Sequence, residues 1–299
     1  MRLKIFSATV LSLGLLAGAC ANSSGDSPGD GGTGGTGSTG GTGSTGTTTP
    51  TTSDQVVLRI EQGGGFVAVQ YNLTRMPMLT LYGDGRYITP GPQIEIYPGP
   101  ALPALAQQRL TPEAVQLLIQ AAIDAGLDSD HSYTTMMVSD APTTTFTLTV
   151  DGETHTTDVY ALDFDMEGAK GMTKGEEQAR KDLAAFQAKA TDLSWLPSGS
   201  VTDEGMYEPS SLRIFSGPYQ PDENVQQTPI AWPLTPGLAE FGDSAENAMG
   251  GMRCGTVAAD AAATLLPLAE QANQLTPWTS DGERYGLWFR PLLPDESGC

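Results

Sequence analysis

A long segment of small residues near the N-terminus limits which part of this chain can fold. Ala21–Asp54 consists almost entirely of Gly, Ser and Thr, with some Pro and Asp, and has no aromatic or large aliphatic residue. Such a segment cannot bury enough apolar surface to offset the entropy lost on ordering. We therefore expect residues 20–54 to form a disordered tether, with a reach of roughly 30 to 35 Å. The folded part is then residues 55–299.

The residues before this tether have the plan of a signal peptide. Arg2 and Lys4 form a short positive region, and Ile5–Ala17 is apolar apart from two Ser, one Thr and one Gly. An apolar run of about a dozen residues is shorter than the roughly 20 that a helix needs to span a bilayer. The sequence therefore predicts export, with residues 1–19 as the signal.

The apolar run ends in Leu15-Leu16-Ala17-Gly18-Ala19-Cys20. This stretch resembles the lipobox of bacterial lipoproteins, in which small residues precede a cysteine that is lipidated and becomes the new N-terminus. The resemblance implies a diacylglycerol on Cys20 that holds the chain at the outer face of the cell membrane, since about two acyl chains give stable anchoring. Lipoboxes usually have Leu where this chain has Ala17. Cleavage after Ala19 or Ala21, with release as a secreted protein, is the alternative.

The chain has three cysteines. With Cys20 assigned to lipid, Cys254 and Cys299 remain as a pair, and outside the cytoplasm such a pair should oxidise. The bridge would close a loop of about 45 residues and stabilise the fold by about 3 to 4 kcal/mol. A reactive or metal-binding thiol is the alternative, but neither cysteine has a neighbouring His or a CxxC partner.

The excess of acidic residues disfavours negatively charged partners. The chain has 35 acidic and 15 basic side chains, which give a formal net charge of −20. Nucleic acid and anionic lipid surfaces repel such a chain, so neither is an expected partner. An acidic surface could instead attract cations or a basic protein.

The first half of the folded part is typical of antiparallel strands. Two Asp-Gly turns lie between β-prone runs, at Gly83-Asp84-Gly85 and at Asp151-Gly152, and each predicts a hairpin. Gly63-Gly64-Gly65 is not a phosphate loop, because no Lys or helix start follows it, and we interpret it as a bulge or turn between strands. The expected strands are 56–60, 66–71, 78–82, 86–88, 143–150 and 153–162.

Two helices are expected in the same half. Thr111 is placed to cap the first, with Pro112 at its first position and Gly126 at its end. Its apolar face would consist of Val115, Leu118, Ile119, Ala122 and Ile123. The second would span about Glu176–Leu193.

The second half has frequent Pro and Gly and a weaker pattern. We expect a strand at Leu212–Phe215, an Ala-rich helix over Gly255–Gln274 interrupted by Pro267, and a strand at Tyr285–Phe289. The whole predicts an α+β fold with a mainly antiparallel sheet and two or three packed helices. Residues 55–299 form one domain, or two at 55–196 and 197–299. Four aromatic residues near the C-terminus are expected to complete the core, with a ligand groove as the alternative: Trp278, Tyr285, Trp288 and Phe289.

Several short motifs together resemble a family of actinobacterial lipoproteins of unknown function. They are Arg253-Cys254-Gly255, Trp278, Tyr285, Arg290–Glu296 and Cys299, with Leu81–Arg86 near the start of the folded part. The resemblance covers a small part of the chain. It implies an envelope location and a related fold but no activity.

One loop has part of a calcium-binding pattern. Asp163-Phe164-Asp165-Met166-Glu167-Gly168 places acidic residues at alternating positions before a Gly. The position that should carry a bidentate Glu is Lys174, and Lys170 stands where an apolar residue is expected. We therefore interpret the segment as a polar surface loop and expect no metal site.

Gly242-Asp243-Ser244 is similar to the nucleophile block of one class of esterases. That class places its histidine downstream, whereas both histidines here, His131 and His155, lie upstream, so a helix cap or loop is the better interpretation. Each histidine is expected to be an exposed polar residue. Two histidines in the whole chain also argue against catalytic zinc.

Acidic pairs could in principle perform acid–base chemistry, for example Glu95 with Asp84 or Asp295 with Glu296, but 35 acids produce such pairs by chance. No catalytic residue and no cofactor is therefore expected. By elimination, the sequence favours a membrane-anchored module that binds a protein or another envelope ligand. The alternative is an extracytoplasmic hydrolase whose site forms only in the fold.

Overall fold

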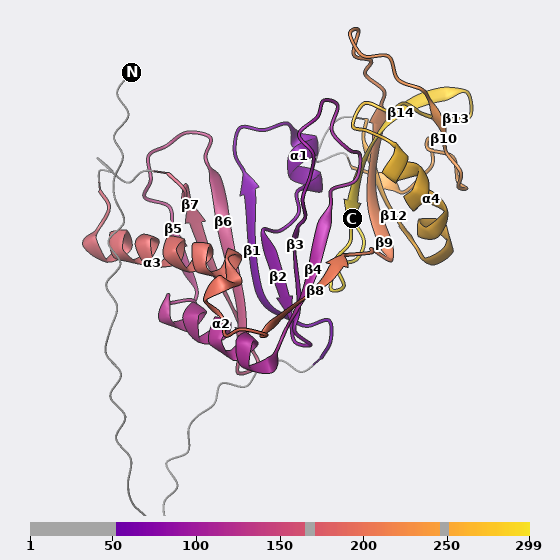
Figure 1. Cartoon of the computed structure of the whole chain (residues 1–299). Coiled ribbons are helices and arrows are strands. Elements are labelled where there is room, and N and C mark those ends of the chain that lie inside the picture. The colour runs from indigo at the N-terminus through magenta and orange to yellow at the C-terminus, as the bar shows by residue number, and fades with distance from the viewer. Residues whose placement is uncertain (1–51, 165–170, 246–250) are drawn as a thin grey trace, which may run out of the picture. The chain divides into compact units, whose positions relative to one another are not determined.

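The computed structural model describes residues 52–164, 171–245 and 251–299. Its strands form two sheets, one of eight strands and one of six, with α-helices packed beside them (Figure 1). All strand pairings are antiparallel except those of His131–Tyr133 and Ile230–Ala231, which are parallel. The expected α+β class with mainly antiparallel sheets is confirmed.

The eight-stranded sheet has the order β5-β7-β6-β1-β2-β3-β4-β8. Its strands are β1 (Val56–Gly64), β2 (Leu79–Tyr82), β3 (Arg86–Pro90), β4 (Leu105–Leu110), β5 (His131–Tyr133), β6 (Pro142–Val150), β7 (Glu153–Tyr160) and β8 (Val201–Met206). Both predicted hairpins, β2–β3 and β6–β7, are present. Gly85 is required at the first turn because a Cβ there would lie 2.4 Å from the carbonyl oxygen of Leu110.

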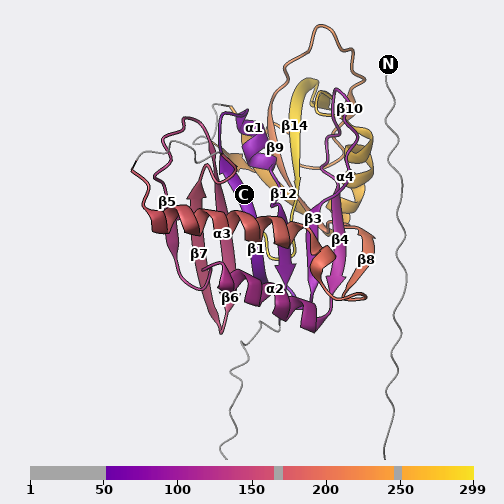
Figure 2. The same ribbon diagram turned by 60° about the vertical axis from the view of Figure 1, so that its left-hand side comes forward.

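Two helices, α2 (Pro112–Asp124) and α3 (Lys174–Thr191), lie across one face of this sheet, followed by the short 3-10 helix η1 (Leu193–Trp195) (Figure 2). Thr111 caps α2 as expected, since its Oγ1 accepts a hydrogen bond from the backbone N–H of Ala114. Leu118 and Ile119 of its apolar face are buried, together with Leu183 and Phe186 of α3. The main core therefore lies between the helices and the sheet.

The strand expected at Phe66–Tyr71 is absent, and that prediction was wrong. Gly64 and Gly65 both have positive φ and turn the chain away from the sheet, where β2 and β6 already occupy both edges of β1. The residues that follow form a short helix, α1 (Val69–Thr74). The side chain of Phe66 is left 89% exposed.

The six-stranded sheet has the order β10-β13-β14-β9-β12-β11, and one helix, α4 (Ala259–Gln271), packs beside it. Its strands are β9 (Ser211–Pro218), β10 (Ile230–Ala231), β11 (Asp243–Ser244), β12 (Arg253–Ala258), β13 (Trp278–Ser280) and β14 (Glu283–Pro291). The strands expected around Leu212 and Tyr285 are confirmed as β9 and β14.

The helix expected over Gly255–Gln274 was placed too early. Its first residues pair with β9 as β12, and the helix begins at Ala259 and continues past Pro267. Trp278 and Phe289 are buried and pack edge to face, with ring centroids 5.5 Å apart, as expected for core aromatics. Tyr285 and Trp288 are only half-buried.

Candidate functional site

The residues singled out in the sequence fall into separate parts of the structure. Cys20 lies outside the described residues, as does most of the acidic loop Asp163–Gly168 with Lys170. Asp163 itself accepts hydrogen bonds from the side-chain amides of Gln62 and Gln187. Within residues 52–164, 171–245 and 251–299, no group of three or more His, Cys, Asp or Glu side chains could hold a metal ion.

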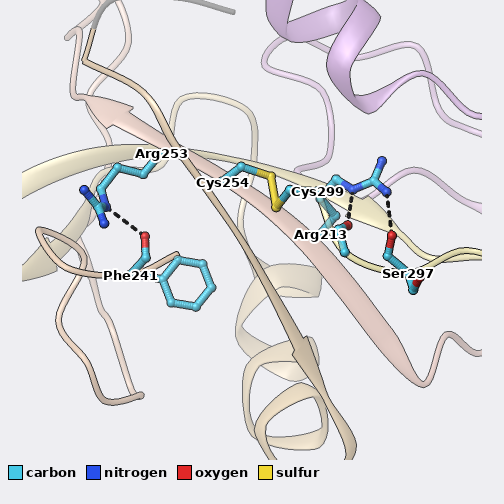
Figure 3. Close-up of a disulfide and its surroundings, with 7 residues drawn as sticks. Arg213, Phe241, Arg253, Cys254, Ser297 and Cys299 are labelled. Carbon is cyan, nitrogen blue, oxygen red and sulfur yellow. Dashed lines mark hydrogen bonds between the residues drawn. A yellow bond between two sulfur atoms is a disulfide. The ribbon is translucent and has the colours of Figure 1, made fainter. Parts of the chain in front are cut away.

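Cys254 of β12 and Cys299 at the C-terminus form a disulfide, with Sγ atoms 2.12 Å apart (Figure 3). Arg213 of β9 holds the same segment, since its Nε donates a 2.7 Å hydrogen bond to the carbonyl oxygen of Gly298. Burial and the nearby charge of Arg290 lower the pKa of Arg213. The C-terminal residues are therefore fixed to the six-stranded sheet.

The acidic pair Asp295 and Glu296 is used for structural contacts. Asp295 accepts hydrogen bonds from Arg59 at 2.7 Å and from the hydroxyl of Tyr82 at 2.6 Å, both in the eight-stranded sheet. Burial and the bond to Asp295 raise the pKa of Tyr82. Glu296 forms a bidentate ion pair with Arg290. Two motifs of the lipoprotein resemblance, Leu81–Arg86 and Arg290–Glu296, thus meet and join the two sheets.

Ser244 lies exposed on β11, at the edge of the six-stranded sheet. The cavity beside it has a volume of about 610 Å³, and neither histidine lines it. The fold requires glycine at the preceding position, Gly242, because a Cβ there would lie 2.0 Å from the carbonyl oxygen of Cys254. The described residues therefore provide no Ser–His dyad at Ser244.

Both histidines belong to the eight-stranded sheet. His131 lies in β5, is exposed as expected, and shares a 3.0 Å hydrogen bond with the hydroxyl of Ser129. Its ring stacks on Tyr133. His155 is half-buried in β7 opposite Leu148 of β6, so it is less exposed than expected.

Exposed apolar side chains gather at one end of the eight-stranded sheet. The strand register identifies which residues lie at this end. Gly64 pairs with Pro142, Thr143 with Tyr160, and Pro90 with Leu105, so the segments that follow or precede these strand ends lie at the same end of the sheet. The segments at this end are 65–78, 91–104, 134–141 and 161–164, together with the last residue of β8, and we call them the apolar end. Among the described residues, ten large hydrophobic side chains are exposed, and nine are at this end: Phe66, Val67, Tyr71, Ile94, Ile96, Tyr97, Met137, Phe164 and Met206. The tenth is Leu117 on α2.

A groove of about 830 Å³ opens beside two of these nine residues, Ile94 and Met206. Its other walls come from the connection between β8 and β9, from α4 and from the end of β14. The apolar lining consists largely of Leu102, Leu105, Leu266 and five prolines: Pro92, Pro100, Pro103, Pro209 and Pro291. A second cavity of about 680 Å³ continues along the same loop and is lined by Tyr71, Ile94, Ile96 and Tyr97.

The loop 91–104 is fixed at several points, so its apolar side chains are held outward. Gly91 N–H donates to the carbonyl of Ala104, and Ala101 N–H to that of Ala272 after α4. The hydroxyl of Tyr97 donates a 2.8 Å hydrogen bond to Asp222. Leu102 packs against the core of the six-stranded sheet. The loop therefore presents a preformed surface rather than a loose chain.

One feature of the sequence, an apolar run between two Gly- and Pro-containing turns, indicates this surface. Ile94-Glu95-Ile96-Tyr97 is an apolar run between Gly91-Pro92 and Pro98-Gly99-Pro100, which makes it a loop instead of a strand. Apolar residues in a connection that cannot pair in a sheet are candidates for binding.

Comparison with family models, curated proteins and solved structures finds no match to this chain. Its helices within the described residues include none that is long and apolar enough to span a membrane.

Proposed function

We propose that this chain is a membrane-anchored extracytoplasmic lipoprotein that binds a protein partner through its apolar end. The observation that carries the proposal concerns the described residues: nine of their ten exposed large hydrophobic side chains lie at one end of one sheet. Scattered apolar residues on a surface need no explanation, but apolar side chains that share one cavity mark a candidate interaction site, and Tyr71, Ile94, Ile96 and Tyr97 line the same cavity.

The energetics favour burial of this group. Removing one Ile or Phe side chain from water stabilises a complex by about 1.5 to 3 kcal/mol. Ile94, Ile96 and Tyr97 lie on a loop fixed by backbone hydrogen bonds, so binding would cost little ordering entropy. A partner that covers several of these residues could therefore bind tightly.

The proposed location depends on the N-terminal residues. Arg2, Lys4 and the apolar run support export, and the lipobox resemblance supports a lipid on Cys20. The tether would keep the apolar end within reach of other envelope proteins. The alternative of a hydrolase gains no support from the described residues, because neither histidine lines the cavity beside Ser244.

Site-specific photocrosslinking in intact cells tests the proposal. A photoreactive amino acid is placed at Ile94 in the apolar end, and in a matched strain at Glu153, an exposed residue in the hairpin turn at the opposite end of the sheet. We expect a discrete crosslinked product from position 94 and none from position 153. Equal crosslinking at both positions, or none at either, would contradict the proposal.

A further inference from the structure

We infer that the partner inserts into the groove a segment that combines apolar side chains with lysine or arginine, an inference that rests on the proposed function. The groove is apolar along most of its lining and has about 830 Å³ of space. That volume is within the range of ligand pockets, roughly 300 to 1,000 Å³, and several apolar side chains could fill it.

The groove offers few hydrogen-bond donors. Five of its lining residues are prolines, which have no backbone N–H. The hydroxyl of Tyr207 already donates a 2.9 Å hydrogen bond to the carbonyl oxygen of Leu292. The remaining side-chain donors are the amide of Gln93 and the hydroxyl of Ser210. A bound segment with side-chain donors of its own, such as an ammonium or guanidinium group, would therefore complement the side chains of the groove.

The charged side chains that line the groove are all acidic. Its charged lining residues are Glu208, from the connection between β8 and β9, and Glu270 on α4. Both are exposed, and neither takes part in an ion pair with a Lys or Arg of the described residues. The net charge of −20 adds a long-range attraction for cations. A basic group next to an apolar one would therefore complement this site.

The remaining exposed residues argue for a macromolecule. Seven of the nine exposed hydrophobic side chains of the apolar end lie outside the groove. A ligand that only filled the groove would leave them in water, whereas a protein surface could cover them. Anionic lipid is disfavoured by the charge of the chain. The occupant is therefore a basic and apolar segment of a partner protein.

Binding of two labelled peptides to the purified full-length protein tests this inference. One peptide alternates Leu with Lys and the other, of equal length, alternates Leu with Glu, and fluorescence anisotropy measures their affinities. The double variant Glu208→Gln/Glu270→Gln removes the charges of the groove. Its matched control, Glu153→Gln/Glu283→Gln, removes two charges from exposed hairpin turns and leaves the same net charge. A third variant, Ile94→Ser/Met206→Ser, changes only exposed apolar residues of the groove.

We expect the lysine peptide to bind and the glutamate peptide to bind far more weakly. The groove variant should weaken binding of the lysine peptide by about tenfold, and the control variant by less than about twofold. Equal weakening by both glutamine variants would mean non-specific attraction and would overturn the inference, while the proposed function would stand. If Ile94→Ser/Met206→Ser left binding of the lysine peptide unchanged, the groove would not be its site, and the inference would fail while the proposed function would stand.

Discussion

A buried arginine fixes the longest helix to the edge of the eight-stranded sheet. The side chain of Arg180 in α3 is 1% exposed, and its Nε lies 3.1 Å from Glu176 one turn earlier. Its other nitrogens donate to the carbonyl oxygens of Tyr160 and Tyr133 at 2.9 and 3.0 Å. Removing the guanidinium would take a hydrogen-bond donor from both carbonyls and the positive charge from Glu176, which would keep its 2.6 Å hydrogen bond from Thr135. Hydrophobic periodicity does not reveal this role, because Arg180 looks like a surface residue in the sequence.

Replacing Arg180 with Ala should therefore lower the free energy of unfolding by about 3 to 5 kcal/mol, as expected when one partner of a buried ion pair is removed. Urea denaturation followed by circular dichroism measures the change. The neighbouring Lys181→Ala breaks an exposed pair with Glu177 and should cost less than about 0.5 kcal/mol. Similar effects of the two variants would show that Arg180 is not a structural anchor.

Among the elements, the C-terminal segment after β14 makes contacts with both sheets. It is joined to β12 by the disulfide of Cys299, to Arg213 of β9 through backbone carbonyls, and to Arg59 and Tyr82 of the other sheet through Asp295. One short segment thus connects the two sheets. Loss of its covalent link should affect the stability of the whole fold.

The variant Cys299→Ser should lower the free energy of unfolding by about 3 to 4 kcal/mol, because the disulfide closes a loop of about 45 residues. Denaturant midpoints of the oxidised protein, the variant and the protein treated with a reductant measure the effect. Reductant should lower the midpoint of the parent protein and leave that of the variant unchanged. An unchanged midpoint on reduction of the parent would rule out a stabilising role for the bridge.

The elements also show which parts of the fold were predictable. Strong local patterns predicted α2, both hairpins and β14, because turn residues and apolar periodicity act within a few neighbouring positions. Phe66–Tyr71 had the composition of a strand, but β2 and β6 already occupy both edges of β1, the strand that precedes it. The two-residue strands β10 and β11 are too short to have a pattern of their own; β10 pairs with β13, which is distant in sequence, and β11 pairs with the next strand, β12.

The candidate site was largely invisible in the sequence for a similar reason. The disulfide could be predicted because the chain has three cysteines, and two remain once Cys20 is assigned to lipid. The groove brings together residues near 92–105, 206–210, 266–270 and 291, and only the folded chain places them side by side. The apolar end depends on the register of β1, β6 and β7, which no short motif encodes.

For the whole molecule, the proposed anchor determines where the apolar end can act. Cys20→Ala should move the protein from the membrane fraction to the medium, or leave its signal uncleaved, because no other cysteine is free to accept the lipid once Cys254 and Cys299 are paired. Cell fractionation with immunoblotting measures the distribution. A variant that was still processed and membrane-bound would contradict lipidation at this residue.

A partner should cover the apolar end in the cell, and hydroxyl-radical footprinting can detect that coverage. Oxidation rates are compared between intact cells and the purified protein for Phe66, Tyr97 and Met137, whose side chains are 89%, 71% and 86% exposed. Leu117 on α2 is the internal control, since it is exposed but outside the apolar end. We predict that the three residues are protected in cells by several-fold relative to Leu117. Equal rates in cells and in the purified protein would contradict the claim.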